Sequence, residues 1–150
     1  MPRPIDELFD AYERRKQQER KAAIEKAAKA ARDREKAIEI LTSQVFAPLE
    51  PLIGQIRSRG HGSELIRAFD GEIPHLMFTF TPSRLNEFDP PPQPSNVRFT
   101  WPGGDQIETV QDVAGAASRS VSERWRIRDV NEDWTHRQVY ALVEAALRNQ

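Results

Sequence analysis

Arginines alternate with bulky apolar residues in the segment RWRIRD, the most distinctive arrangement of chemically active side chains in this sequence. Arg124, Arg126 and Arg128 are separated by Trp125 and Ile127. On an extended strand, this alternation places the guanidinium groups on one face, about 7 Å apart. A row of guanidinium groups favours the binding of phosphate or of an acidic protein surface.

Arg98, in the segment VRFTW, has the same parity on a strand of its own. The predicted anion-binding face therefore consists of four arginines, Arg98, Arg124, Arg126 and Arg128. The alternative is a solvated strand whose arginines pair with carboxylates on the neighbouring strand, such as that of Glu108. The sequence favours this second interpretation, because surface ion pairs are common.

Histidines and acids do not form a metal-binding motif. His61, His75 and His136 are far apart, and a structural role is the better interpretation of each. The segment DVNEDW resembles the start of a calcium loop, but Trp134 stands where glycine is required and Tyr140 where the bidentate glutamate belongs. Its acids instead favour the N-terminus of a helix. We expect neither a metal nor a cofactor.

Neither a nucleotide-binding loop nor an activated serine is recognisable. The glycines of WPGGDQ lack the spacing of a phosphate-binding loop and indicate a hairpin turn. Ser118, Ser120 and Ser122 lack the motif of a nucleophile elbow. The sequence therefore favours a protein that is not an enzyme, although a site assembled from distant residues stays open.

The parts of the chain that must carry these side chains differ in charge. The chain has 150 residues, of which 38% are hydrophobic and 30% charged, as expected for one domain with an appendage. Residues 12–36 hold ten Lys and Arg against five Asp and Glu, whereas residues 37–150 hold eleven against fifteen. Ten of the twelve aromatic residues lie at Phe46 or later. A basic N-terminal segment thus precedes a body that is able to bury a core.

Composition also bears on location. The chain contains no cysteine, so disulfides and thiolate metal sites are excluded. No segment is apolar enough to span a membrane, and the start MPRPIDELFD lacks the features of a secretory signal. We therefore expect a cytoplasmic protein without a membrane partner.

A long helix is predicted for residues 5–46, because this segment contains neither proline nor glycine and is rich in helix-forming residues. Pro48 and Pro51 are expected to end or kink the helix near Phe46, with a short helix following over residues 51–59. The predicted division is an oligomerisation helix over residues 1–46 and a body over residues 47–150.

Two apolar stripes on this helix predict self-association. The first stripe has the helical spacing i, i+3, i+4, i+7 and consists of Ile5, Leu8, Phe9 and Tyr12. The second fits the heptad seam of a coiled coil and consists of Ile24, Ala28, Ala31, Ile38, Leu41 and Val45. A homodimer or higher oligomer is the leading interpretation, with the direction of pairing left open.

Two other partners are considered for the same chain. The basic residues 14–36 offer contacts for nucleic-acid phosphates, although acids are interspersed and the bases do not share one helical face. The open face of the sheet offers a surface for another protein. The leading interpretation is thus a non-enzymatic interaction or scaffold module, and a nucleic-acid or anion binder is the alternative.

The body is predicted to be an antiparallel sheet of about five strands, over residues 64–69, 75–81, 97–101, 105–113 and 123–130. The proline-rich residues 82–95 indicate an exposed loop. In the C-terminal helix, Thr135 and Gln138 fit a capping box, and Trp134 and Val139 fit a hydrophobic staple. The expected fold class is α+β, with the helices on one face of the sheet.

Overall fold

Five antiparallel strands form a single sheet in the computed structural model, which describes residues 4–84, 86–115 and 119–149. The spatial order of the strands follows the chain, as β1 (Gly62–Ala68), β2 (His75–Thr81), β3 (Ser95–Thr100), β4 (Gln106–Val113) and β5 (Arg119–Arg126). Each strand pairs with the next one along the chain, so the sheet is an antiparallel meander. The predicted α+β fold is confirmed.

Alternation along the strands determines which face of the sheet is buried. On β2, Leu76, Phe78 and Phe80 are buried, while the residues between them are partly exposed. The register places Leu76 opposite Phe99 and Phe78 opposite Val97, so these side chains form a continuous apolar surface across β2 and β3.

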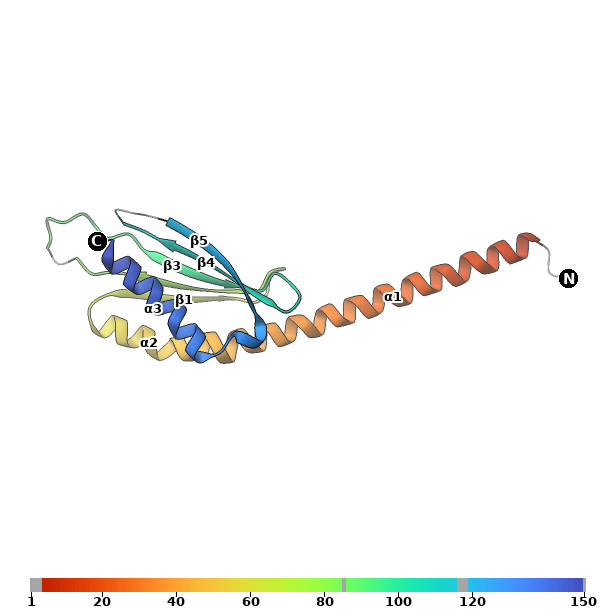
Figure 1. Ribbon diagram of the computed structural model, residues 1–150, viewed down its shortest axis with the longest axis horizontal. Helices are drawn as coiled ribbons and strands as arrows, with labels where there is room; N and C mark the ends of the chain where they lie inside the picture. The colour runs from red at the N-terminus through yellow and green to blue at the C-terminus, as the bar shows by residue number, and fades with distance from the viewer. Residues whose placement is uncertain (1–3, 85, 116–118, 150) are drawn as a thin grey trace.

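Two helices cover this apolar surface, and Figure 1 shows both on the same side of the sheet. Helix α2 (Ala47–Ser58) packs on β1, and helix α3 (Glu132–Arg148) packs on β3 and β4. Helix α3 contributes a buried stripe of Trp134, Thr135, Val139, Leu142 and Ala146. One sheet face thus carries the core, as the sequence predicts.

The sequence predicts that the long N-terminal helix ends or is kinked near Phe46, and of these two outcomes the end was wrong. Helix α1 (Pro4–Ile40) continues through a π-helical turn, η1 (Leu41–Phe46), directly into α2. Pro48 lies in the first turn of α2, where a missing N–H is tolerated. In the π-helical turn, the backbone N–H of Ala47 donates to the carbonyl oxygen of Thr42, five residues back.

A hydrogen bond from a distant helix compensates for Pro48. In a regular α-helix, the N–H of residue 48 would donate to the carbonyl of Gln44, and proline has no such group. The hydroxyl of Thr135 donates to the carbonyl oxygen of Gln44 instead, at 2.7 Å. This bond joins two segments 91 residues apart in the sequence and ties α3 to the π-helical turn.

Helix α3 begins one turn earlier than predicted. Its N-cap is Asn131, whose side-chain oxygen accepts the backbone N–H of Trp134 at 2.8 Å. Thr135 is therefore inside the helix, and its assignment as the N-cap was wrong. Glu132 and Asp133 occupy the first turn, where negative charge is favoured, as the sequence predicts for these acids.

Strand β5 is also displaced from its predicted position. It starts at Arg119, four residues before the predicted start at residue 123, and it ends at Arg126. The residues that follow form a 3-10 turn, η2 (Ile127–Asp129), which leads into α3. The predicted strand over residues 123–130 was therefore wrong in its second half.

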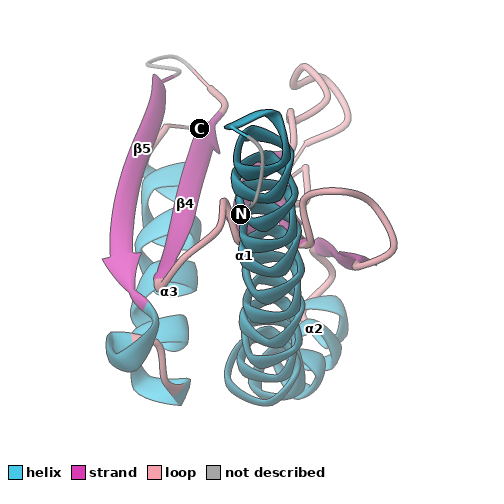
Figure 2. Ribbon diagram, turned by 90° about the vertical axis from the view of Figure 1, so that its right-hand side faces the viewer, coloured by secondary structure: helices cyan, strands magenta, loops and turns pink. Residues whose placement is uncertain are grey.

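Residues 4–32 of α1, called the arm below, are exposed along their entire length. At 1.5 Å per residue this free helix is about 40 Å long. It extends away from the sheet and helices in Figure 1, and Figure 2 looks along it from its N-terminal end. Burial begins where the helix reaches the body, with Ala37, Leu41 and Val45 fully buried.

Arg34 holds the base of the arm against the body. Its guanidinium group donates to the carbonyl oxygens of Phe69, at 2.6 Å, and of Gly71, at 2.7 Å. A third hydrogen bond, of 3.1 Å, reaches the carbonyl of Glu72. All three acceptors belong to the turn between β1 and β2, so one side chain fixes the arm to the end of a hairpin.

We predict that replacing Thr135 with Val lowers the free energy of unfolding by about 1–3 kcal/mol, because the Gln44 carbonyl then loses its donor. Thr135→Ser is the matched control, since it keeps the hydroxyl and should cost about 1 kcal/mol or less. Urea denaturation followed by circular dichroism measures both variants. Equal losses in the two variants would contradict a stabilising role for the hydrogen bond.

A second prediction concerns Arg34. Replacing it with Ala removes three hydrogen bonds from a charged donor and should lower the free energy of unfolding by about 2 kcal/mol. Replacement of the neighbouring exposed Arg32 with Ala should change it by less than about 0.5 kcal/mol. Thermal and urea unfolding of the two variants compare them directly, and similar stabilities would contradict the proposed clamp.

Candidate functional site

Four exposed apolar residues lie close together at the free end of the arm. They form the first stripe predicted from the sequence, and their exposed fractions are 55% for Ile5, 70% for Leu8, 59% for Phe9 and 51% for Tyr12. These four side chains share one side of the helix, and no described part of the body lies beside them (Figure 1). Apolar surface of this kind marks an interaction site.

Basic groups lie next to this stripe. The guanidinium carbon of Arg15 and the amino nitrogen of Lys16 are each 5.6 Å from the centre of the Tyr12 ring. The amino group of Lys16 also lies 3.4 Å from the carboxylate of Glu19, one turn further on.

Acids predominate at the tip of the arm, where Asp6, Glu7, Asp10 and Glu13 occur without a basic residue between positions 4 and 13.

The second predicted stripe is divided by the structure. Leu41 and Val45 are fully buried in the chain's own core, and Ile38 is partly buried beside them. Ile24, Ala28 and Ala31 remain exposed. Apolar periodicity predicted that these six positions face a partner, but the last part of the seam packs on the sheet of the same chain instead. Only the part of the stripe within the arm is free for another molecule.

The four arginines of the predicted anion-binding face do not form one row. Arg124 pairs with Glu108 on the neighbouring strand, with 3.3 Å between Nε and the carboxylate oxygen. Arg98 lies opposite Val110 instead, and Arg128 lies in the 3-10 turn and not on a strand. Arg126 is opposite Gln106. Arg124 is thus paired as the solvated alternative expects, and the anion-binding role of the four arginines stays a prediction.

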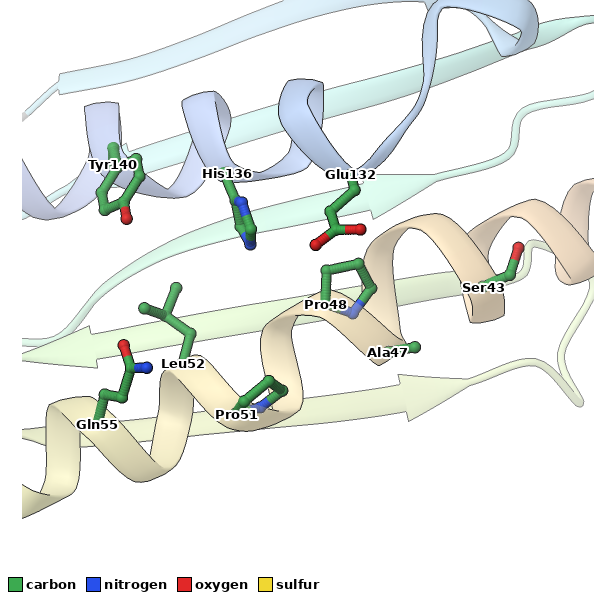
Figure 3. A pocket seen from close by; sticks show the side chains of 9 residues that line it. All are labelled: Ser43, Ala47, Pro48, Pro51, Leu52, Gln55, Glu132, His136 and Tyr140. Atoms are coloured by element: carbon green, nitrogen blue, oxygen red, sulfur yellow. The ribbon is translucent and has the colours of Figure 1, made fainter.

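A groove of about 440 Å³, which no sequence pattern predicted, lies between α2 and α3. Figure 3 shows Glu132, His136 and Tyr140 on successive turns of α3, facing Pro48 and other residues of α2. The rings of His136 and Tyr140 are 6.2 Å apart. The two walls come from segments distant in the sequence, so no local pattern indicates the groove.

The groove has no activated nucleophile. Ser43 lines one end of it, but its hydroxyl donates to the carbonyl of Glu39, at 2.8 Å. Figure 3 shows this serine well separated from His136 along the groove. The groove does not bring a serine and a base together for hydrolysis (Figure 3).

The other histidines contact the backbone. Nδ1 of His61 accepts the backbone N–H of Ser83, at 2.9 Å, and Nδ1 of His75 lies 3.0 Å from the carbonyl oxygen of Ile73. Within residues 4–84, 86–115 and 119–149, no group of three or more histidine, aspartate or glutamate side chains is placed to hold a metal ion. Of the serines considered from sequence, Ser120 and Ser122 lie on β5, and Ser118 falls outside the described residues.

In the part of the chain that the structure describes, no helix has both the length and the apolar character needed to cross a membrane.

Comparison with known proteins gave no significant match to any family model, to any curated protein or to any solved structure.

For the sheet's outer face, we predict that replacing Arg124, Arg126 and Arg128 together with Ser changes the free energy of unfolding by less than about 1 kcal/mol, because exposed ion pairs contribute little. The Arg124 side chain is 62% exposed, which supports this expectation. Thermal unfolding measures the change. A loss of several kcal/mol would show that these arginines belong to a stabilising network.

The same triple variant tests for a functional arginine face. Because the four arginines do not form one row in the native chain, heparin should bind the variant and the native chain with affinities within about twofold of each other at about 0.15 M salt. A decrease of tenfold or more would restore the anion-binding interpretation.

Proposed function

We propose that the protein is a non-enzymatic interaction module that self-associates through its arm. The observation that carries this proposal is the stripe of Ile5, Leu8, Phe9 and Tyr12, each more than half exposed at the end of a helix projecting from the body. The cytoplasmic location expected from sequence is part of the same proposal.

Solvent alone is a poor explanation for such a helix. Most of the stability of helices in proteins comes from packing of an apolar face and not from intrinsic helix propensity. The arm has such a face, but its residues are all exposed, and the helix becomes partly buried only from Asp33 onward. A second copy of the chain provides the missing contact without requiring another gene product.

The energetic balance favours a weak dimer. Two copies of the stripe contribute eight large apolar side chains, which at about 1.5 kcal/mol each give about 12 kcal/mol as an upper figure. Association costs about 4–15 kcal/mol. The most favourable combination leaves about 8 kcal/mol, which corresponds to a dissociation constant of about 1 μM. We therefore expect a dissociation constant in the micromolar range or above, and a measurable dependence of the oligomeric state on protein concentration.

Nucleic-acid binding is the second candidate, and one observation favours it. Residues 14–21 are exposed on every side of the helix and contain five Lys and Arg against one acid. If this segment binds duplex DNA or RNA through six or more phosphates, affinity must fall by decades between about 50 and 200 mM salt. A salt-independent response excludes that function, whereas apolar self-association persists or strengthens with salt.

We predict that the full chain is dimeric at about 100 μM and that Ile5→Glu/Phe9→Glu is monomeric, because the substitutions place four carboxylates per dimer in the apolar contact. Multi-angle light scattering measures both masses. Gln17→Glu/Gln18→Glu is the matched control, since it adds the same charge to the arm away from the stripe and should remain dimeric.

A chain starting at Asp33 completes the test. It keeps Arg34 and the buried residues that follow, whereas a chain starting at Ala47 would lose Ala37, Leu41 and Val45 from the core. The shortened chain should be monomeric. A native chain that is monomeric at about 100 μM would contradict the proposal, and a dimeric shortened chain would move the interface to the body.

A further inference from the structure

One face of the arm continues the side of the helix that enters the core. Eleven residues make three turns of an α-helix with only about 20° to spare, so residues eleven apart lie on nearly the same side. Tyr12, Ala23 and Arg34 are spaced in this way. Because Arg34 binds the β1–β2 turn and the helix is α-helical as far as Ile40, Tyr12 and Ala23 point to the side of the arm on which the body lies.

This core-side face changes in size along the arm. Its residues are large at the tip and small near the body, and the exposed ones along its centre are Ile5, Leu8, Tyr12, Ala23, Ala27 and Ala30. Phe9 and Lys26 lie at the margins of the same face. Lys16 and Glu19 occupy the middle of the same face. The alanines leave a shallow strip in which bulky side chains of another helix fit closely.

The spacing of these positions is symmetric about the point between Gln17 and Gln18. From Ile5 to Lys16 the steps are three, four and four residues, and from Glu19 to Ala30 they are four, four and three. A helix and its copy running in the opposite direction therefore present each large residue to a small one. Such a match keeps the two axes at a constant separation of about 8–10 Å.

We propose that the arm binds the arm of a second copy in antiparallel orientation, with Ile5, Leu8 and Tyr12 of each copy against Ala30, Ala27 and Ala23 of the other. This inference rests on the proposed self-association and specifies its direction and register. Lys16 of one copy then lies opposite Glu19 of the other, on both sides of the twofold axis.

In this register, the paired arm ends just before the body of the other copy begins. The first helical turn of one copy lies beside Ala30 of the other, one turn before Arg34 and the β1–β2 turn that it holds. Ile73 in that turn is an exposed apolar residue, with 53% of its surface accessible. The free length of the arm and the length of the symmetric pattern thus agree.

Charge favours the antiparallel direction over the parallel one. The tip, residues 4–13, contains four acids and no base. Parallel arms would place these acids against each other, large residues against large ones, and Lys16 against Lys16. Antiparallel arms place the acidic tip beside residues 22–31, where Lys26 and Lys29 outnumber Glu25. In both directions, residues 14–21 of one copy lie beside residues 14–21 of the other, so their charges favour neither direction.

Distances between spin labels test the direction in the full-length chain, because the absence of native cysteine allows single labels. Gln18→Cys and Lys29→Cys are both exposed and lie away from the core-side face. In the antiparallel register the two labels at residue 18 are nearly level, whereas those at residue 29 are separated by about 35 Å along the axis. The measured distance should be about 10–20 Å longer at residue 29 than at residue 18.

Each other result overturns the inference. Equal distances at the two positions would show parallel arms, and the proposed self-association would survive. Loss of dipolar coupling at both positions, with a monomeric mass at the labelling concentration, would contradict self-association itself and the inference with it.

An exchange of side-chain size tests the register independently. Leu8→Ala removes a contact and Ala27→Leu creates a clash with Leu8 of the other copy, so each should weaken dimerisation by about tenfold or more. The double variant Leu8→Ala/Ala27→Leu again pairs one small with one large side chain, and it should return the dissociation constant to within about threefold of the native value. Additive weakening in the double variant would overturn the pairing of these positions.

Discussion

The direction of the arm is determined by the helix to which it belongs, because this helix is packed in the core and continues outward from it. Leu41, Val45 and Leu49 are fully buried in the body, and the same helical segment continues outward without a break. Arg34 fixes the point of exit through its hydrogen bonds to the β1–β2 turn. Because an α-helix is stiff over a few tens of ångströms, the arm is presented in one orientation relative to the sheet.

This arrangement separates the two tasks of the helix along its length. The core-forming half stabilises the sheet, and the arm carries apolar groups that the body cannot reach. Two copies paired through their arms place their bodies at opposite ends, with both grooves between α2 and α3 outside the contact between the arms. The proposed dimer would hold its two grooves at a fixed separation, and we propose that this separation is the functional consequence of the arm.

Local sequence patterns predicted the parts of the fold that depend on local physics. Strand β2 alternates over its full length and was predicted with correct bounds. Pro48 misled the prediction because its compensating donor, Thr135, is 91 residues away. Asn131 and Thr135 are both capping residues, and only the packing of α3 on the sheet selects between them.

The candidate site was predicted in part. The exposed stripe at the tip was recognised from its helical spacing, but periodicity cannot distinguish residues that face a partner from those that face the same chain, as Leu41 and Val45 show. Arg34 carried no recognisable signal, since its acceptors are backbone carbonyls. Small-angle X-ray scattering tests the central claim most directly. Paired arms predict twice the chain mass of 17.2 kDa and two bodies about 50 Å or more apart, whereas the mass of one chain at about 100 μM would contradict it.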